Sequence, residues 1–92
     1  MPWTVEYVEE FEQWLLGLPE KRQDQIFAAI LLLQRDGPAL RRPKVGKIVG
    51  SRHENMKELI PPGGHYRILF AFDPDRKAIL LVGGDKTDRW RE

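Results

Sequence analysis

Large apolar and polar residues alternate over residues 3–7, a spacing typical of a half-buried strand. Apolar residues then recur at helical spacing over residues 8–18, which predicts a helix. Gly17 and Pro19 end this helix, because the residue before a proline disfavours helical backbone angles. A second apolar stripe begins after Glu20 and stops at residues 36–38 (D-G-P). The sequence therefore predicts a strand followed by two helices joined by a tight turn.

Three strand-like segments follow in the second half of the chain, at residues 56–60, 66–72 and 78–82. The turns between them, at residues 61–64 (P-P-G-G) and 73–76 (D-P-D-R), are of hairpin length and indicate an antiparallel meander. Residues 39–55 are basic and predict a long irregular loop with at most a short strand, and such loops are often functional. This order predicts one α+β domain over residues 1–92, with both helices on one face of the sheet.

The composition narrows the kinds of site that the chain can hold. There is no cysteine, which excludes disulfides and thiolate metal sites. The two histidines, His53 and His65, are too few and too far apart for a metal site, so neither a metal nor a cofactor is expected. Residues 26–33 are the longest apolar stretch, shorter than the roughly 20 residues of a membrane span, and the N-terminus lacks signal-peptide features. A soluble cytoplasmic protein is expected.

The net charge of +1 hides an uneven distribution along the chain. Residues 1–24 carry six acidic side chains against two basic ones, whereas residues 35–53 carry six Lys or Arg residues and one His against a single acid. A domain polarised in this way can present a basic face to phosphate groups. A solvated charged surface with no ligand explains the same pattern, so charge alone leaves both interpretations open.

Three segments together carry a resemblance to a known family. They are residues 55–59 (N-M-K-E-L), 66–74 (Y-R-I-L-F-A-F-D-P) and 81–87 (L-V-G-G-D-K-T). With the order of elements from Trp3 onward, the chain resembles the phage-derived, HigB-like branch of the RelE/ParE toxin superfamily. The resemblance implies a RelE-like fold, in which a mainly antiparallel sheet of four or five strands packs on two N-terminal helices.

The resemblance also implies a function. Such toxins bind RNA on the concave side of the sheet, and many cleave mRNA without a metal, often on the ribosome, which stops translation and growth. Each is encoded beside an antitoxin, in this branch a helix-turn-helix protein, and the two form a hetero-oligomer. Two alternatives remain open: a ParE-like toxin that inhibits DNA gyrase without catalysis, and an inactive homologue that only binds the antitoxin.

Arg67 is the first candidate for the chemistry. Strand alternation directs Tyr66 toward the helices and Arg67 toward the open face of the sheet, where its planar guanidinium suits a phosphate. The resemblance places an arginine of the superfamily at this position. Alternation also puts Glu58 on the open face, as a candidate general base, and Lys57 on the core side, from which its long stem can reach the rim. Alternatively, Arg67 is a solvated arginine or forms a cross-strand ion pair with Glu58, worth about 0.2–1 kcal/mol.

The other candidates lie at the end of the last strand and in the basic loop. The resemblance assigns Lys86 to the scissile phosphate, and Asp85 either orients Lys86 or transfers a proton; an exposed turn pair is the alternative. Relatives often carry an arginine where this chain has Ile60, and they continue past Glu92 with an aromatic tail whose stacking or proton donation would be missing here. Further basic residues are expected to contact RNA, with salt-dependent affinity: Arg41, Arg42, Lys44, Lys47, Arg52, His53 and Arg89.

Overall fold

The computed structural model describes residues 3–42, 44–47, 56–63 and 65–85 of the 92-residue chain. The first half contains a strand, β1 (Thr4–Tyr7), two helices, α1 (Glu9–Leu16) and α2 (Glu20–Asp36), and a short 3-10 helix, η1 (Gly37–Ala39). Four strands follow: β2 (Val45–Lys47), β3 (Met56–Leu59), β4 (Tyr66–Asp73) and β5 (Lys77–Asp85). Each predicted element is present, including the short strand in the basic segment. No helix in the described part of the chain is long and apolar enough to cross a membrane.

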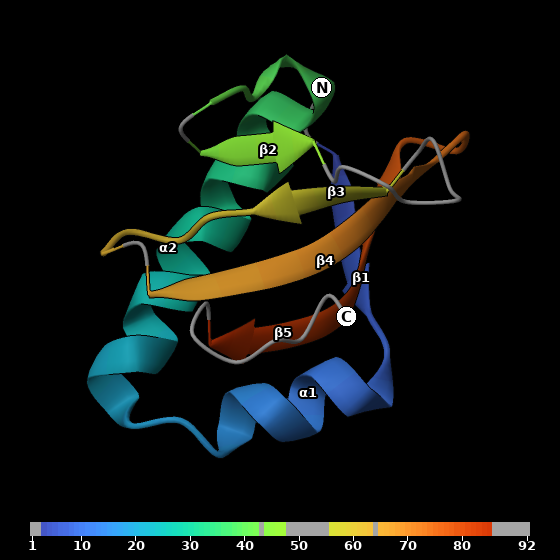
Figure 1. Ribbon diagram of the computed structural model, residues 1–92. Helices are drawn as coiled ribbons and strands as arrows, with labels where there is room; N and C mark the ends of the chain where they lie inside the picture. Colours follow the sequence, from blue (N-terminus) through green and yellow to red (C-terminus); the bar gives the residue numbers. More distant parts are fainter. Residues whose placement is uncertain (1–2, 43, 48–55, 64, 86–92) are drawn as a thin grey trace.

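The five strands form one sheet in the order β1-β5-β4-β3-β2 (Figure 1). Strands β2 to β5 pair antiparallel with their neighbours in sequence, which confirms the predicted meander. Strand β1 joins the far edge of the sheet parallel to β5, with Val5 in register with Ala78. The sheet is therefore mixed but mainly antiparallel, and β1 and β2 are its two edge strands.

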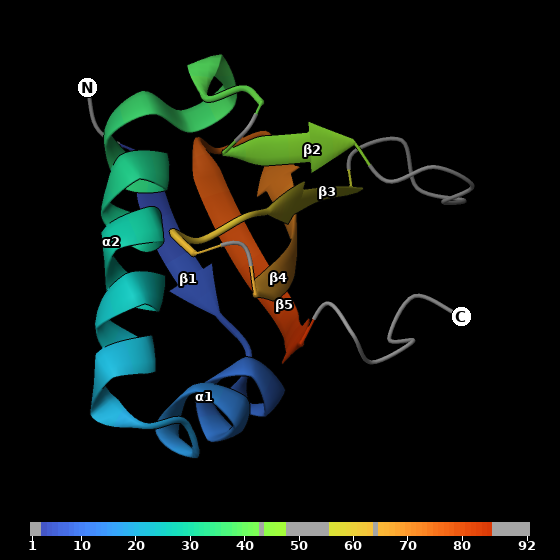
Figure 2. The same cartoon turned by 60° about the vertical axis from the view of Figure 1, so that its left-hand side comes forward.

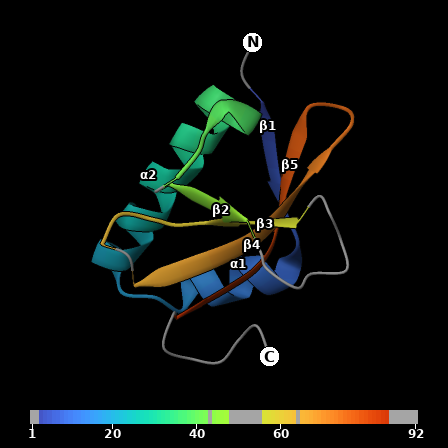
Figure 3. The same ribbon diagram turned by 45° about the horizontal axis from the view of Figure 1, so that its top comes forward.

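Both helices lie on the same side of the sheet. Figure 2 shows α2 running along one face, with α1 crossing near its lower end, and Figure 3 shows the same arrangement from above. The core between the layers is apolar and fully buried, with Phe11, Ile26 and Leu33 from the helices against Ile68, Phe70 and Leu80 from the sheet. Burying one such side chain contributes about 1.5–3 kcal/mol relative to leaving it exposed. This core determines which face of the sheet α1 and α2 leave uncovered.

Strand β5 is longer than the sequence predicted. Pairing with β4 does not end at Val82 but continues to Asp85, after a register shift opposite Leu69 and Phe70. Gly83 pairs with Ile68 in this extension, and a Cβ built on Gly83 would lie 2.3 Å from the ring of Trp14 on α1. The glycine therefore allows α1 to pack directly on the strand, and the usual depletion of glycine in strands does not apply here.

Candidate functional site

Arg67 and Glu58 come together on the face of the sheet that the helices leave uncovered. Residues Ile68 and Phe70 of β4 are fully buried toward the helices, so alternation directs Arg67 to the other face. Glu58 on β3 is in register with Leu69, two positions along from Arg67 and on the same face. The two charges are therefore diagonal neighbours across adjacent strands.

The two side chains form a specific ion pair. The Nε of Arg67 donates a hydrogen bond of 3.0 Å to Oε1 of Glu58, and its Nη1 donates one of 2.9 Å to the backbone carbonyl of Tyr66. The side chains are only 15% and 8% exposed, respectively. The cross-strand pair that the sequence left open is thus present, but it is largely buried, where one charge without its partner costs several kcal/mol. The carbonyl of Tyr66 fixes the guanidinium further, a contact that residue types alone do not reveal.

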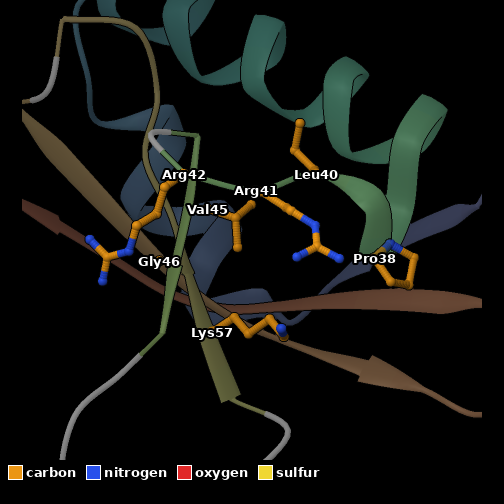
Figure 4. A pocket seen from close by; sticks show the side chains of 7 residues that line it. All are labelled: Pro38, Leu40, Arg41, Arg42, Val45, Gly46 and Lys57. Carbon is orange, nitrogen blue, oxygen red and sulfur yellow. The ribbon is translucent and has the colours of Figure 1, made fainter.

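Lys57 points away from this pair, as alternation predicted. It is in register with Phe70 on β4, which puts it on the helix-bearing face. There it lines a pocket of about 450 Å³ (Figure 4) together with Pro38, Leu40, Arg41, Arg42, Val45 and Gly46. Figure 4 shows Arg41 and Lys57 reaching into the same space, whereas Arg42 extends toward the other side of β2. The structure therefore does not bring Lys57 to Arg67 and Glu58.

Asp85 lies at the end of β5, next to the start of β4. Asp85 is in register with Tyr66, whereas Arg67 is opposite Gly84. The ring of Tyr66 contacts Trp14 on the helix side at 5.7 Å between centroids, so this tyrosine is part of the packing between α1 and the sheet. Register thus places Asp85 on that side rather than beside Arg67.

The remaining basic candidates divide into two groups. Lys44 accepts a backbone hydrogen bond of 2.8 Å from Ile60, and Lys47 ends β2 in register with Lys57. Arg52, His53, Lys86 and Arg89 lie outside the described residues. Among the residues that the structure does describe, no three carboxylate or imidazole side chains are grouped so as to hold a metal ion. A shifted pKa is found away from the site, where a hydrogen bond from Arg35 lowers the pKa of Asp36.

Sequence comparison assigns the family. The model of the family described as phage-derived protein Gp49-like matches residues 13–91. The chain belongs to this Gp49-like family. Two Mycobacterium tuberculosis proteins named as candidate toxins are similar to it: HigB2, 48% identical over 93 residues, and HigB3, 49% identical over 88. The matches cover 98% and 96% of this chain, but 46% of HigB2 and 77% of HigB3, so the chain spans about half the length of the first relative.

Solved structures show that this Gp49-like chain has the RelE fold. The RelE–RelB complex of Pyrococcus horikoshii superimposes with a TM-score of 0.72 at 18% identity, covering 96% of this chain and 99% of that one. The isolated Escherichia coli RelE toxin gives a TM-score of 0.71 at 10% identity, covering 97% and 92%. At these identities the likeness concerns the fold alone. Both the predicted HigB-like resemblance and the predicted RelE-like fold are confirmed.

Proposed function

We propose that this protein is the toxin of a type II toxin–antitoxin system and that it cleaves mRNA without a metal ion, in the cytoplasm and in association with the ribosome. The observation that carries the proposal is the Arg67–Glu58 pair, which joins a guanidinium, a group suited to binding phosphate, to a carboxylate on the sheet face that α1 and α2 leave uncovered. Family membership, the RelE fold and the two relatives named as candidate toxins support it.

The proposed chemistry is an in-line transfer within the RNA. The Glu58 carboxylate accepts the proton of a ribose 2′-hydroxyl, the 2′-oxygen forms a bond to phosphorus, and the bond from phosphorus to the 5′-oxygen breaks. Arg67 stabilises the negative charge of the phosphorane, and such charge stabilisation is usually the larger contribution to the rate acceleration. A general base contributes an acceleration of about 10²–10⁴-fold. Lys86 is proposed to assist the phosphate, with Asp85 orienting it from the helix side, and a water molecule gives the leaving 5′-oxygen its proton. The products are a 2′,3′-cyclic phosphate and a 5′-hydroxyl end.

The guanidinium of Arg67 must reach the substrate in this scheme. Its side chain is 15% exposed, and its bond to Glu58 holds the carboxylate beside the position where the phosphate would bind. Arg42 flanks this surface, because a Cβ built on Gly46, the register partner of Glu58, would lie 4.0 Å from Nη2 of Arg42. Arg42 and the basic residues beyond it are therefore proposed to hold the RNA backbone on either side of the scissile bond.

Regulated expression in a bacterial host tests the proposal. Induction should arrest growth and generate new 5′-hydroxyl ends in mRNA, and Glu58→Gln should abolish both, because it removes the base but keeps the shape. Glu6→Gln is the matched control, since Glu6 pairs with Lys77 at 3.8 Å on the exposed surface. Growth arrest with intact mRNA would overturn the ribonuclease proposal. Inhibited supercoiling by gyrase would then favour a ParE-like toxin, and harmless expression an inactive homologue.

A protein partner belongs to the same proposal. Solved neighbours of the same fold include several complexes of a toxin with its antitoxin, among them that of E. coli RelE with RelB and that of M. tuberculosis RelBE2. We expect a helix-turn-helix antitoxin encoded beside this chain to bind it in a hetero-oligomer. Co-expression with the neighbouring reading frame should restore growth, and continued arrest would count against this partner.

A further inference from the structure

We propose that the pocket beside β2 binds a carboxylate of an extended, acidic segment from a protein partner, and that this segment adds to the free edge of the sheet as a further strand. The inference rests on the proposed function only in expecting a protein partner. The central cations of the pocket, Arg41 and Lys57, lie apart from the Arg67–Glu58 pair, because register puts Lys57 on the helix-bearing side of β3, while Arg42 borders both surfaces. Failure of one proposal therefore leaves the other testable.

The charge of the pocket points to an anion. Arg41, Arg42 and Lys57 line it, and none of its described lining residues is acidic. In the described part of the chain, none of the three cations forms an ion pair or a side-chain hydrogen bond. Arg41, in the segment that follows η1, and Lys57 on β3 reach into the same space (Figure 4). Two neighbouring cations of this kind repel one another until an anion lies between them.

The position of β2 points to an extended segment. Strand β2 is at the edge of the sheet, and its described pairing is with β3 alone. The N–H of Val45 already donates a hydrogen bond of 3.2 Å to the carbonyl of Arg41, so a partner strand would pair with the other outward backbone groups of β2. Val45 and Gly46 belong to β2 and line the pocket as well, so the pocket adjoins this edge. Every second side chain of an added strand would face the helix side of the sheet, which is the side of the pocket.

The lining favours a peptide over RNA. Pro38, Leu40 and Val45 give the pocket an apolar side, with Val45 only 6% exposed. An acidic residue with apolar neighbours fills such a mixed pocket, because its aliphatic atoms cover Leu40 and Val45 while the carboxylate meets Arg41 and Lys57. Single-stranded RNA usually adds base stacking on aromatic rings to its phosphate contacts, and no described lining residue is aromatic.

Amide NMR spectra of the purified, isotopically labelled chain test the inference with three probes. These are the blocked peptide Val-Glu-Val-Glu-Val, the same peptide with Gln in place of Glu, and hexauridylate RNA. The acidic peptide should shift the amide signals of Val45, Gly46 and Lys57, and leave those of Ile68 and Leu69 in place. The Gln peptide should bind at least about tenfold more weakly, because charge-assisted hydrogen bonds are roughly twice as strong as neutral ones.

Charge reversal provides the matched variants. Lys57→Glu and Arg41→Glu should each weaken the acidic peptide at least about tenfold, while Arg35→Glu, outside the pocket and already beside Asp36, should not. Unchanged amide dispersion would show that each variant is folded. Equal binding of the acidic and Gln peptides, or binding unaffected by Lys57→Glu and Arg41→Glu, would overturn the inference. Signals at the pocket shifted by hexauridylate and not by the acidic peptide would identify it as an RNA site instead.

Discussion

The Arg67–Glu58 pair has a structural role and a proposed catalytic role, and the two act against each other. As an ion pair with side chains 15% and 8% exposed, it is stabilising only while both partners are present. In the proposed cleavage site, the same guanidinium must also face a phosphate. The carbonyl of Tyr66 reconciles the two roles in part, because it holds Nη1 of Arg67 independently of the carboxylate. The geometry of the proposed site is thus set by folding and does not depend on the substrate.

A double-mutant cycle measures how strongly the two charges depend on each other. Arg67→Met should lower the free energy of unfolding by about 3–5 kcal/mol, because it leaves the Glu58 carboxylate buried without this partner. Adding Glu58→Leu should recover a large part of that loss, since two apolar residues replace a buried pair. Urea denaturation of the single and double variants gives the coupling energy.

The exposed pair of Lys77 and Glu6 is the control for this cycle. Its atoms are 3.8 Å apart and its side chains are 40% and 52% exposed, so the same cycle should give a coupling of about 0–1 kcal/mol. Equal coupling energies for the two pairs would contradict a buried, structurally important ion pair at Arg67.

Among the elements, β5 shows most clearly which parts of the secondary structure sequence patterns predict and which they miss. Periodicity predicted the helices and the meander, because each buries one apolar face with a regular spacing. It missed the last three residues of β5, because glycine in a strand is favoured only where another residue packs closely on the backbone, and sequence spacing does not show that contact. Here Trp14, far away in sequence, lies over Gly83. Alternation likewise placed Glu58 and Arg67 on one face, but their burial depends on packing between distant segments and could not be predicted locally.

Gly83→Ala tests the contact between α1 and β5. The added methyl group would lie 2.3 Å from the Trp14 ring, so the ring or the helix must move, and overpacking of this kind costs about 1–3 kcal/mol. Trp14→Leu in the same chain should reduce this penalty by making room. Gly17→Ala should be nearly neutral, because its nearest atoms would be at 3.5 and 3.7 Å. Thermal unfolding checks all three, and a neutral Gly83→Ala would show that this packing is wrong.

At the scale of the molecule, the sheet separates two charged surfaces. One carries Arg67 and Glu58 on the face without helices, and the other is the pocket of Arg41 and Lys57 on the helix side. Alternation placed Lys57 on the core side, but sequence reasoning still counted Lys57 among the catalytic candidates and Arg41 among the RNA contacts, because it could not show which basic residues share a face. The register of β3 with β4 supplies that information, with Glu58 opposite Leu69 and Lys57 opposite Phe70.

Two separate surfaces predict that RNA and an acidic peptide bind at the same time. The Glu58→Gln variant should bind RNA without cutting it. In this variant, a saturating concentration of the Val-Glu-Val-Glu-Val peptide should change the dissociation constant for hexauridylate by less than about threefold. That corresponds to a coupling free energy below about 0.7 kcal/mol, smaller than typical allosteric coupling. Fluorescence anisotropy of labelled RNA provides the measurement, with the Gln peptide as the control. Mutual exclusion would instead mean that the two ligands share one continuous basic surface around β2, and that a short acidic strand alone is enough to displace RNA.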